Sequence, residues 1–222
     1  MIKNMNFFEN EIILYHGSKD IIEKSLKNKG KKNNDYGLGF YCTDNINLAK
    51  EWAVTRTHDG FANKYSLDIN GLNILNLQDY DLIYWISILL ENRDLHSSDN
   101  FLPGGKEFLI KNYHIDLSDY DIIVGYRADD SYFSYMRRFM SGGLSLEQLE
   151  DVLHYGHLGL QYVLISDKAF SRIKFLGYEN ALRQDYLDKK IKRDNEARNS
   201  FKQLHLDING TFLLNILQGG DK

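Results

Sequence analysis

Two short segments near the start of the chain combine hydrogen-bonding side chains, glycines and aromatic rings. The first is Tyr15-His16-Gly17-Ser18, which follows the apolar run 11–15. The second, residues 35–43, reads Asp-Tyr-Gly-Leu-Gly-Phe-Tyr-Cys-Thr. Glycine lets the backbone approach a bound molecule closely, and a tyrosine ring offers a flat surface for stacking. The two segments predict a binding pocket around His16 and Tyr41.

The residue types in this pocket suit a dinucleotide whose nicotinamide–ribose bond is to be broken. His16 can hydrogen-bond a ribose hydroxyl, while Gly17 and Ser18 bring bare backbone to the carboxamide. Tyr41 provides an aromatic wall for the pyridinium ring. Loss of nicotinamide leaves an oxocarbenium-like centre, which the site must stabilise. The pocket thus has the groups that NAD or an NAD-like dinucleotide would use.

The order of these features resembles a known group of enzymes. His-Gly-Ser after a strand, then Gly-x-Gly-x-Tyr-x-Thr and a helix with an aromatic residue, is similar to the ADP-ribosyltransferases of the diphtheria-toxin and poly-ADP-ribose-polymerase branch. Their signature is a His-Tyr-Glu triad, whose first two members match His16 and Tyr41. Trp52 stands at the spacing of that branch's second stacking aromatic. The resemblance implies an α+β fold with split sheets flanked by helices.

Four motifs in order resemble, more narrowly, an uncharacterised bacterial family of that fold. They are Tyr-His-Gly-Ser, Asp-x-Gly-x-Gly-Phe-Tyr-x-Thr, Gly-Tyr-Arg-Ala-Asp-Asp-Ser-Tyr-Phe and Leu-Gly-x-Gln-Tyr-Val-x-x-Ser. Four short motifs in one order are more specific than any of them alone. The resemblance covers residues 11–178. It predicts an ADP-ribosyltransferase-like domain at 1–178 and a helical extension at 179–222 packed on it.

The chain departs from the branch at the third member of the triad. Gln161 stands where the resemblance places the glutamate. A glutamine accepts a hydrogen bond from a hydroxyl but supplies neither negative charge nor a base. Asp129 or Asp130 could replace the missing charge, and Arg127 beside them could hold a pyrophosphate bidentately. The alternative is structural, with both aspartates capping the next helix and Arg127 as their ion-pair partner.

Two functions of different classes follow. The first is an enzyme that passes ADP-ribose from NAD to a protein, a nucleic acid or water. Bacterial members of such folds often serve as toxins or defence effectors, so the resemblance also implies an antitoxin protein as a partner. The second is a non-catalytic module that uses the same pocket to sense a nucleotide or hold a partner protein. Fold alone does not separate the two.

The elements that position these residues follow from hydrophobic periodicity and turn signals. Asp44 is the expected N-cap of the first helix, and Asn70-Gly71 is a turn that would pair the strands at 64–69 and 72–77. Ser145 and Gln148 form a capping-box signature. Strands without regular βαβ alternation favour mixed or antiparallel sheets. Strands are expected at 11–15, 64–69, 72–77, 120–126, 160–165 and 173–178, and helices at 45–56, 82–91, 129–140, 145–155, 166–172 and 180–204.

Composition narrows the class of protein further. The formal net charge is −4, which gives no overall basic surface for a nucleic-acid backbone. Cys42 is the single cysteine, so no disulfide forms within the chain. No long apolar run indicates a signal peptide or membrane span, and no ligand cluster indicates a metal site. We expect a cytoplasmic protein with no membrane partner.

Overall fold

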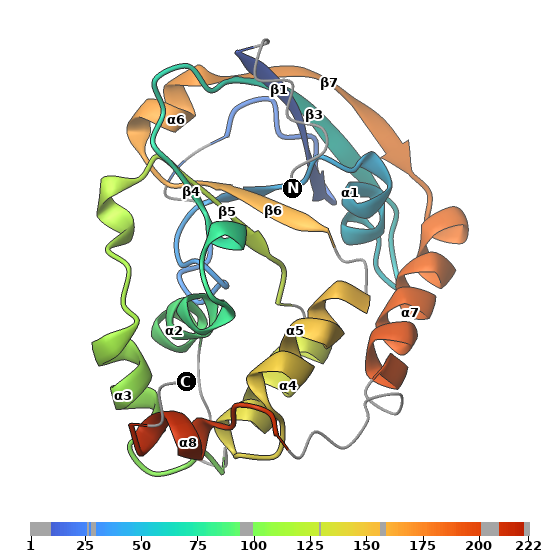
Figure 1. The fold of residues 1–222 in the computed structure, drawn as a ribbon. Coiled ribbons are helices and arrows are strands. Elements are labelled where there is room, and N and C mark those ends of the chain that lie inside the picture. The colour runs from blue at the N-terminus through green and yellow to red at the C-terminus, as the bar shows by residue number, and fades with distance from the viewer. Residues whose placement is uncertain are drawn as a thin grey trace.

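The computed structural model describes residues 10–25, 27, 30–93, 100–128, 130–155, 159–200 and 209–219. Its strands form two sheets that meet at an angle (Figure 1). The first has the order β1-β3-β7 and is antiparallel throughout, with strands β1 (Glu11–Ser18), β3 (Gly60–Asp68) and β7 (Ile173–Ala181). The second has the order β2-β6-β5-β4, with strands β2 (Phe40–Cys42), β4 (Ile74–Asn76), β5 (Ile122–Tyr126) and β6 (Leu160–Leu164).

Only the pairing of β4 with β5 is parallel among the described strands. The expected α+β class with mixed sheets is therefore confirmed. The helices are α1 (Ile46–Ala53), α2 (Leu82–Asn92), α3 (Gly105–Asn112), α4 (Asp130–Met140), α5 (Leu146–Tyr155), α6 (Asp167–Arg172), α7 (Arg183–Ser200) and α8 (Leu213–Leu217), with short 3₁₀ turns η2 (Leu77–Asp79) and η3 (Leu117–Asp119). No helix in the described ranges is both long and apolar enough to cross a membrane.

A small hydrophobic cluster of Ala53, Val54 and Ala181 packs against Tyr186 and Leu187 of α7, and two larger cores hold the layers together. One lies between the two sheets and contains Leu14, Leu67 and Leu164, each fully buried. The other fills the space between the second sheet and helices α2, α3, α4 and α5, around Trp85 and Phe139. Figure 1 shows α1 beside the first sheet, and α7, which follows β7, lies against α1, α4 and α5. The second sheet is thus buried on both faces, which suits its apolar strands.

An isolated β-bridge between Tyr15 and Thr43 joins the two sheets where the sequence motifs lie. The backbone N–H of Tyr15 donates to the carbonyl of Thr43 at 2.7 Å, and Thr43 N–H donates back to Tyr15 at 2.9 Å. This bridge places the end of β2 against β1. The two motif segments are therefore neighbours in space although residues 19–34 separate them in the sequence.

Several expected elements differ from those observed. The first helix is capped by Asn45, whose side chain accepts from Asn47 N–H and Leu48 N–H, so Asp44 is not its cap. The strand at 74–76 does not return along β3, because it pairs in parallel with β5 in the other sheet. The capping box of Ser145 and Gln148 is confirmed by reciprocal hydrogen bonds of 3.0 and 3.2 Å.

Candidate functional site

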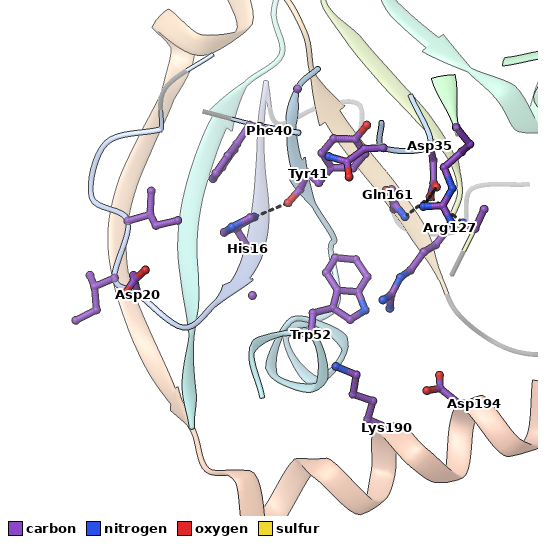
Figure 2. Close-up of a pocket in the computed structure, with 18 of the residues that line it drawn as sticks. His16, Asp20, Asp35, Phe40, Tyr41, Trp52, Arg127, Gln161, Lys190 and Asp194 are labelled. Atoms are coloured by element: carbon purple, nitrogen blue, oxygen red, sulfur yellow. Dashed lines mark hydrogen bonds and ion pairs between the residues drawn. The ribbon is translucent and has the colours of Figure 1, made fainter. Parts of the chain in front are cut away.

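A cleft of about 980 Å³ opens between β1, the segment 30–41, α1, β6 and α7 (Figure 2). It brings together most of the residues that the sequence analysis selected. These are His16, Gly17, Tyr41, Trp52, Arg127 and Gln161. Ser18 is not among the described residues that line it, and its hydroxyl instead accepts from Asp20 N–H at 3.1 Å. The volume is in the range of natural ligand pockets.

A hydrogen bond joins His16 of β1 to Tyr41 of β2, next to the bridge between the two sheets. The Nδ1 atom of His16 lies 2.7 Å from the Tyr41 carbonyl oxygen. A carbonyl only accepts, so Nδ1 carries the proton and a neutral ring keeps a lone pair on Nε2. Burial lowers the pKa of His16 below its usual value, and the bond to Tyr41 opposes that shift. The imidazole stacks on Phe40 with ring centres 4.5 Å apart. His16 Nε2 is therefore a fixed hydrogen-bond acceptor at the cleft.

Tyr41 contributes its ring and not its hydroxyl. The hydroxyl donates to the Gly37 carbonyl at 2.7 Å and accepts from Tyr36 N–H at 3.1 Å, so it closes the turn at 36–41. Burial raises the pKa of Tyr41, so the phenol stays protonated. Gly37 has a φ of 72°, the left-handed conformation that the turn requires and that glycine adopts without strain. Because these hydrogen bonds fix the Tyr41 side chain, its ring forms a wall of the cleft against which a flat ligand can stack.

Gly17 sets how close α1 comes to β1. A Cβ atom at this position would overlap the carbonyl oxygen of Ala49 and lie 3.0 Å from Ala53 N. Glycine therefore allows the helix backbone to rest on the strand. The contact fixes the side of α1 that carries Trp52, which is half-buried in the cleft instead of packed in the core.

Trp52 and Arg127 form a stacked pair inside the cleft. The guanidinium carbon of Arg127 lies 4.5 Å from the centre of the Trp52 ring (Figure 2). The ring restrains the guanidinium, and its planar donors remain suited to a phosphate. The buried Nε1–H of Trp52 has no hydrogen-bond partner among the described residues. The pair supplies positive charge and an aromatic surface at one place.

Gln161 lies on β6, 5% exposed, and faces a carboxylate that the sequence analysis did not single out. Its Nε2 donates to Asp35 Oδ2 at 3.3 Å, and its Oε1 has no partner among the described residues. Asp35 also pairs with Arg93, whose Nη1 lies 3.4 Å from Oδ1. In the sequence, Asp35 is marked only as the first residue of the Asp-x-Gly-x-Gly motif.

The aspartates expected to replace the triad glutamate cannot be located at the cleft. Asp129 lies outside the described residues, and Asp130 is described only as the first residue of α4. The described cleft instead gains three charged residues from α7 that sequence reasoning missed. They are Lys190, Asp194 and Arg198, spaced four apart on one helical face. This four-residue spacing is the sequence feature that could have placed the three side chains on one face of the helix.

Helix α7 is fixed to α1 by a buried ion pair. Arg193 donates from Nε and Nη2 to the two carboxylate oxygens of Glu51, at 2.8 and 3.0 Å. Glu51 is 3% exposed, so its carboxylate is shielded from water, whereas the Arg193 side chain is partly exposed. Lys190 adds a bond to the Val54 carbonyl at 3.1 Å. The wall that α7 contributes to the cleft is therefore attached to the helix that carries Trp52.

This arrangement defines an α+β protein with a polar and aromatic cleft at the junction of two sheets. The chain belongs to the family described as "Protein of unknown function (DUF3990)", whose model matches residues 12–175. No curated protein and no solved structure matches the chain. The family match includes every cleft residue from His16 to Gln161 and ends before α7. No group of three metal-binding side chains occurs within the described ranges.

Proposed function

We propose that this chain is an NAD-dependent ADP-ribosyltransferase of the cytoplasm, with NAD bound in the cleft described above. The observation that carries the proposal is the His16–Tyr41 pair, joined at 2.7 Å on the wall of a cleft of about 980 Å³. The cleft holds a neutral acceptor, an aromatic wall and a stacked guanidinium. A nicotinamide dinucleotide needs each of these groups.

Each group has a part in binding. His16 Nε2 accepts from a ribose hydroxyl, and the Tyr41 ring covers the nicotinamide. Arg127 binds the pyrophosphate through its paired N–H groups, and Trp52 holds the guanidinium in place. The free Oε1 of Gln161 accepts from a hydroxyl of the nicotinamide ribose. These contacts hold NAD with its C1′–N bond inside the cleft.

The chemical step follows an SN1-like route. The C1′–N bond breaks with its electron pair on nicotinamide, which leaves as the neutral base. The ribose is then an oxocarbenium ion, and an acceptor nucleophile forms the new bond to C1′ while losing a proton. The acceptor is a protein, a nucleic acid or water. Under this proposal the protein acts as a bacterial toxin or defence effector, held in check by an antitoxin partner.

Gln161 favours a second candidate function. Without the glutamate, the triad position offers no negative charge to an oxocarbenium ion. The same cleft would then act as a catalytically impaired module that binds NAD or another nucleotide, or as a protein-interaction domain. In the enzymatic proposal a carboxylate from elsewhere in the chain restores the charge. Loss of NAD turnover in Asp129→Ala or Asp130→Ala would assign that role to one of these two aspartates.

Incubation with NAD labelled in the adenylate part tests the proposal. We expect nicotinamide release, or label on macromolecules, that His16→Ala and Tyr41→Ala abolish. Growth arrest on expression should be relieved by the same two variants. The control is Asp121→Asn, which alters a buried carboxylate outside the cleft. Saturable NAD binding without release would favour the binding module, and absence of NAD binding would refute both nucleotide functions.

A further inference from the structure

Asp35 is a buried acid that the roles assigned so far do not use. It lines the cleft at 5% exposure and comes from the segment between β1 and β2. Its Oδ2 accepts from Ala128 N–H at 2.9 Å and from Gln161 Nε2 at 3.3 Å. Its Oδ1 faces the Arg93 guanidinium at 3.4 Å. Figure 2 shows its side chain directed at Gln161. Asp35 thus connects three parts of the chain at the cleft.

The described partners of Asp35 favour its ionised form. Each is a donor, namely a backbone N–H, an amide NH₂ and a guanidinium, and a carboxylate has lone pairs for all of them. Of the three, only the Gln161 amide could turn to offer an acceptor to a protonated Asp35, whereas the Ala128 N–H and the Arg93 guanidinium donate in every case. Burial raises the pKa of Asp35 overall, although the Ala128 N–H, the two arginines Arg93 and Arg127, and Gln161 oppose the shift. The donor contacts of Ala128 and Arg93 are the geometric ground for placing a negative charge next to Gln161.

The same contact fixes which end of the Gln161 amide faces the ligand. Because Nε2 donates to a carboxylate, a flipped amide would set two acceptors against each other. Oε1 consequently points away from Asp35, buried and without a partner among the described residues. Buried polar atoms are nearly always satisfied, so an orphaned oxygen on a cleft wall indicates a ligand donor. A ribose hydroxyl is such a donor.

We infer that Asp35 is a positioning residue that acts through Gln161, and that the two side chains together take the place of the triad glutamate. Asp35 holds the Gln161 amide with its oxygen toward the substrate and polarises that oxygen with its own charge. Oε1 then accepts a hydroxyl hydrogen bond that strengthens as the ribose becomes positive. The inference rests on the proposed reaction with NAD, and it locates the required charge at Asp35.

A double-mutant cycle separates this role from a structural one. We expect Asp35→Asn to lower kcat for nicotinamide release about tenfold or more, with KM changed less than about threefold, because the polarised bond matters most in the transition state. Gln161→Ala should cost at least as much. In the Gln161→Ala background, Asp35→Asn should cost less than about threefold, since its path to the substrate is already removed.

The matched control is Asp121→Asn. Asp121 is also a buried carboxylate that accepts a backbone N–H and pairs with a cation, but it lies at the opposite end of the β5–β6 pair from Gln161. It should leave kcat unchanged. Additive losses in the cycle, or an Asp35→Asn variant with wild-type kcat, would overturn the inference while leaving the proposed function intact. So would loss of turnover in Asp129→Ala or Asp130→Ala together with normal turnover in Asp35→Asn.

Two further readouts cover the remaining outcomes. The side-chain NH₂ signals of Gln161 in a ¹H–¹⁵N spectrum, identified by their loss in Gln161→Ala, should shift in Asp35→Asn without any NAD. Unchanged signals would overturn the inference. If the wild type binds NAD without releasing nicotinamide, the same cycle is read on Kd, and non-additivity is again expected. A wild type without saturable NAD binding would overturn the proposed function, and this inference with it.

Discussion

The Arg127 guanidinium stacks on Trp52 at 4.5 Å, although the two residues belong to different layers of the fold. Trp52 lies on α1, beside the first sheet, whereas Arg127 directly follows β5 of the second sheet. The pair therefore spans the junction at which the His16–Tyr41 bond also lies. A ligand that bridges the junction meets both sheets, and its affinity should respond to each side of the pair.

Removal of the Trp52 ring should weaken NAD binding. Trp52→Ala leaves Arg127 without its platform, and a cation–π contact of about 0.5–2 kcal/mol predicts a Kd raised about 2- to 30-fold. Trp52→Phe keeps a ring and should lose less. Isothermal titration measures both. The chain has two tryptophans, Trp52 and Trp85, so NAD should quench fluorescence in the wild type but not in Trp52→Phe. Equal quenching in the two proteins would contradict a role for Trp52.

His16 should make the stability of the folded protein depend on pH. Its pKa in the fold is lowered from 6.5 by burial, so between the two values the unfolded chain binds more protons. The contribution of His16 to the free energy of unfolding is therefore complete above about pH 6.5. It is lost as the pH drops through the lowered pKa that His16 has in the folded protein. Each unit of lowering corresponds to about 1.4 kcal/mol.

Urea unfolding between pH 8 and pH 5 measures this dependence. His16→Gln should flatten the wild-type slope below pH 6.5, because glutamine does not titrate. His58→Gln removes an exposed histidine outside the cleft and is the control. Identical slopes for the wild type and His16→Gln would show that His16 protonates equally well in the fold.

The sequence predicted the main elements and much of the cleft because those signals are local. An apolar run at 120–126, a capping box at Ser145 and the two glycine segments each depend on neighbouring residues. The strand partners depend on distant ones, and so β4 was assigned to the wrong sheet. The contact of Asp35 with Gln161 joins residues 126 positions apart. No local pattern marks either side chain as the partner of the other.

Glu51 gives a second example of a signal that the sequence hides. In the expected helix 45–56 it reads as a solvated acid, yet it is 3% exposed. The reason is Arg193, which lies 142 positions away and covers it from α7. The α7 sequence is rich in charged residues, and Arg193 and Lys190 pack on α1 and the residue after it alongside the apolar Tyr186 and Leu187. Hydrophobic periodicity cannot detect the part of this face that arginine and lysine supply.

Loss of Arg193 should destabilise the protein. Arg193→Ala removes the bidentate partner of a buried carboxylate, which costs about 3 kcal/mol, the low end for a buried pair because the arginine side chain is 26% exposed. Arg193→Lys keeps the charge but not the two-pronged geometry and should lose less. Chemical denaturation measures both. Glu51→Leu with Arg193→Leu should be less damaging than Arg193→Ala, since no charge is left buried. A loss of under about 0.5 kcal/mol in Arg193→Ala would mean that α7 does not depend on this pair.

Gly17 affects both the packing of α1 on β1 and the position of Trp52 at the proposed NAD site. A methyl group at this position would overlap the Ala49 carbonyl oxygen, and backbone atoms cannot move aside as a flexible side chain does. Gly17→Ala should therefore push α1 away from β1, lower the free energy of unfolding by about 1–3 kcal/mol, and displace Trp52 from Arg127.

Gly143→Ala is the matched control, because a Cβ atom there meets its nearest neighbour, the Arg138 carbonyl oxygen, at an ordinary 3.6 Å. It should leave the Tm and the NAD affinity near wild type. The two effects of Gly17→Ala can be separated by measuring NAD affinity well below its Tm, where the variant is still folded. A folded Gly17→Ala protein with wild-type NAD affinity would show that the closeness of α1 serves stability alone. A weakened Kd in that folded protein would show that the helix-to-strand distance sets the Trp52 platform and that Gly17 affects NAD binding through packing.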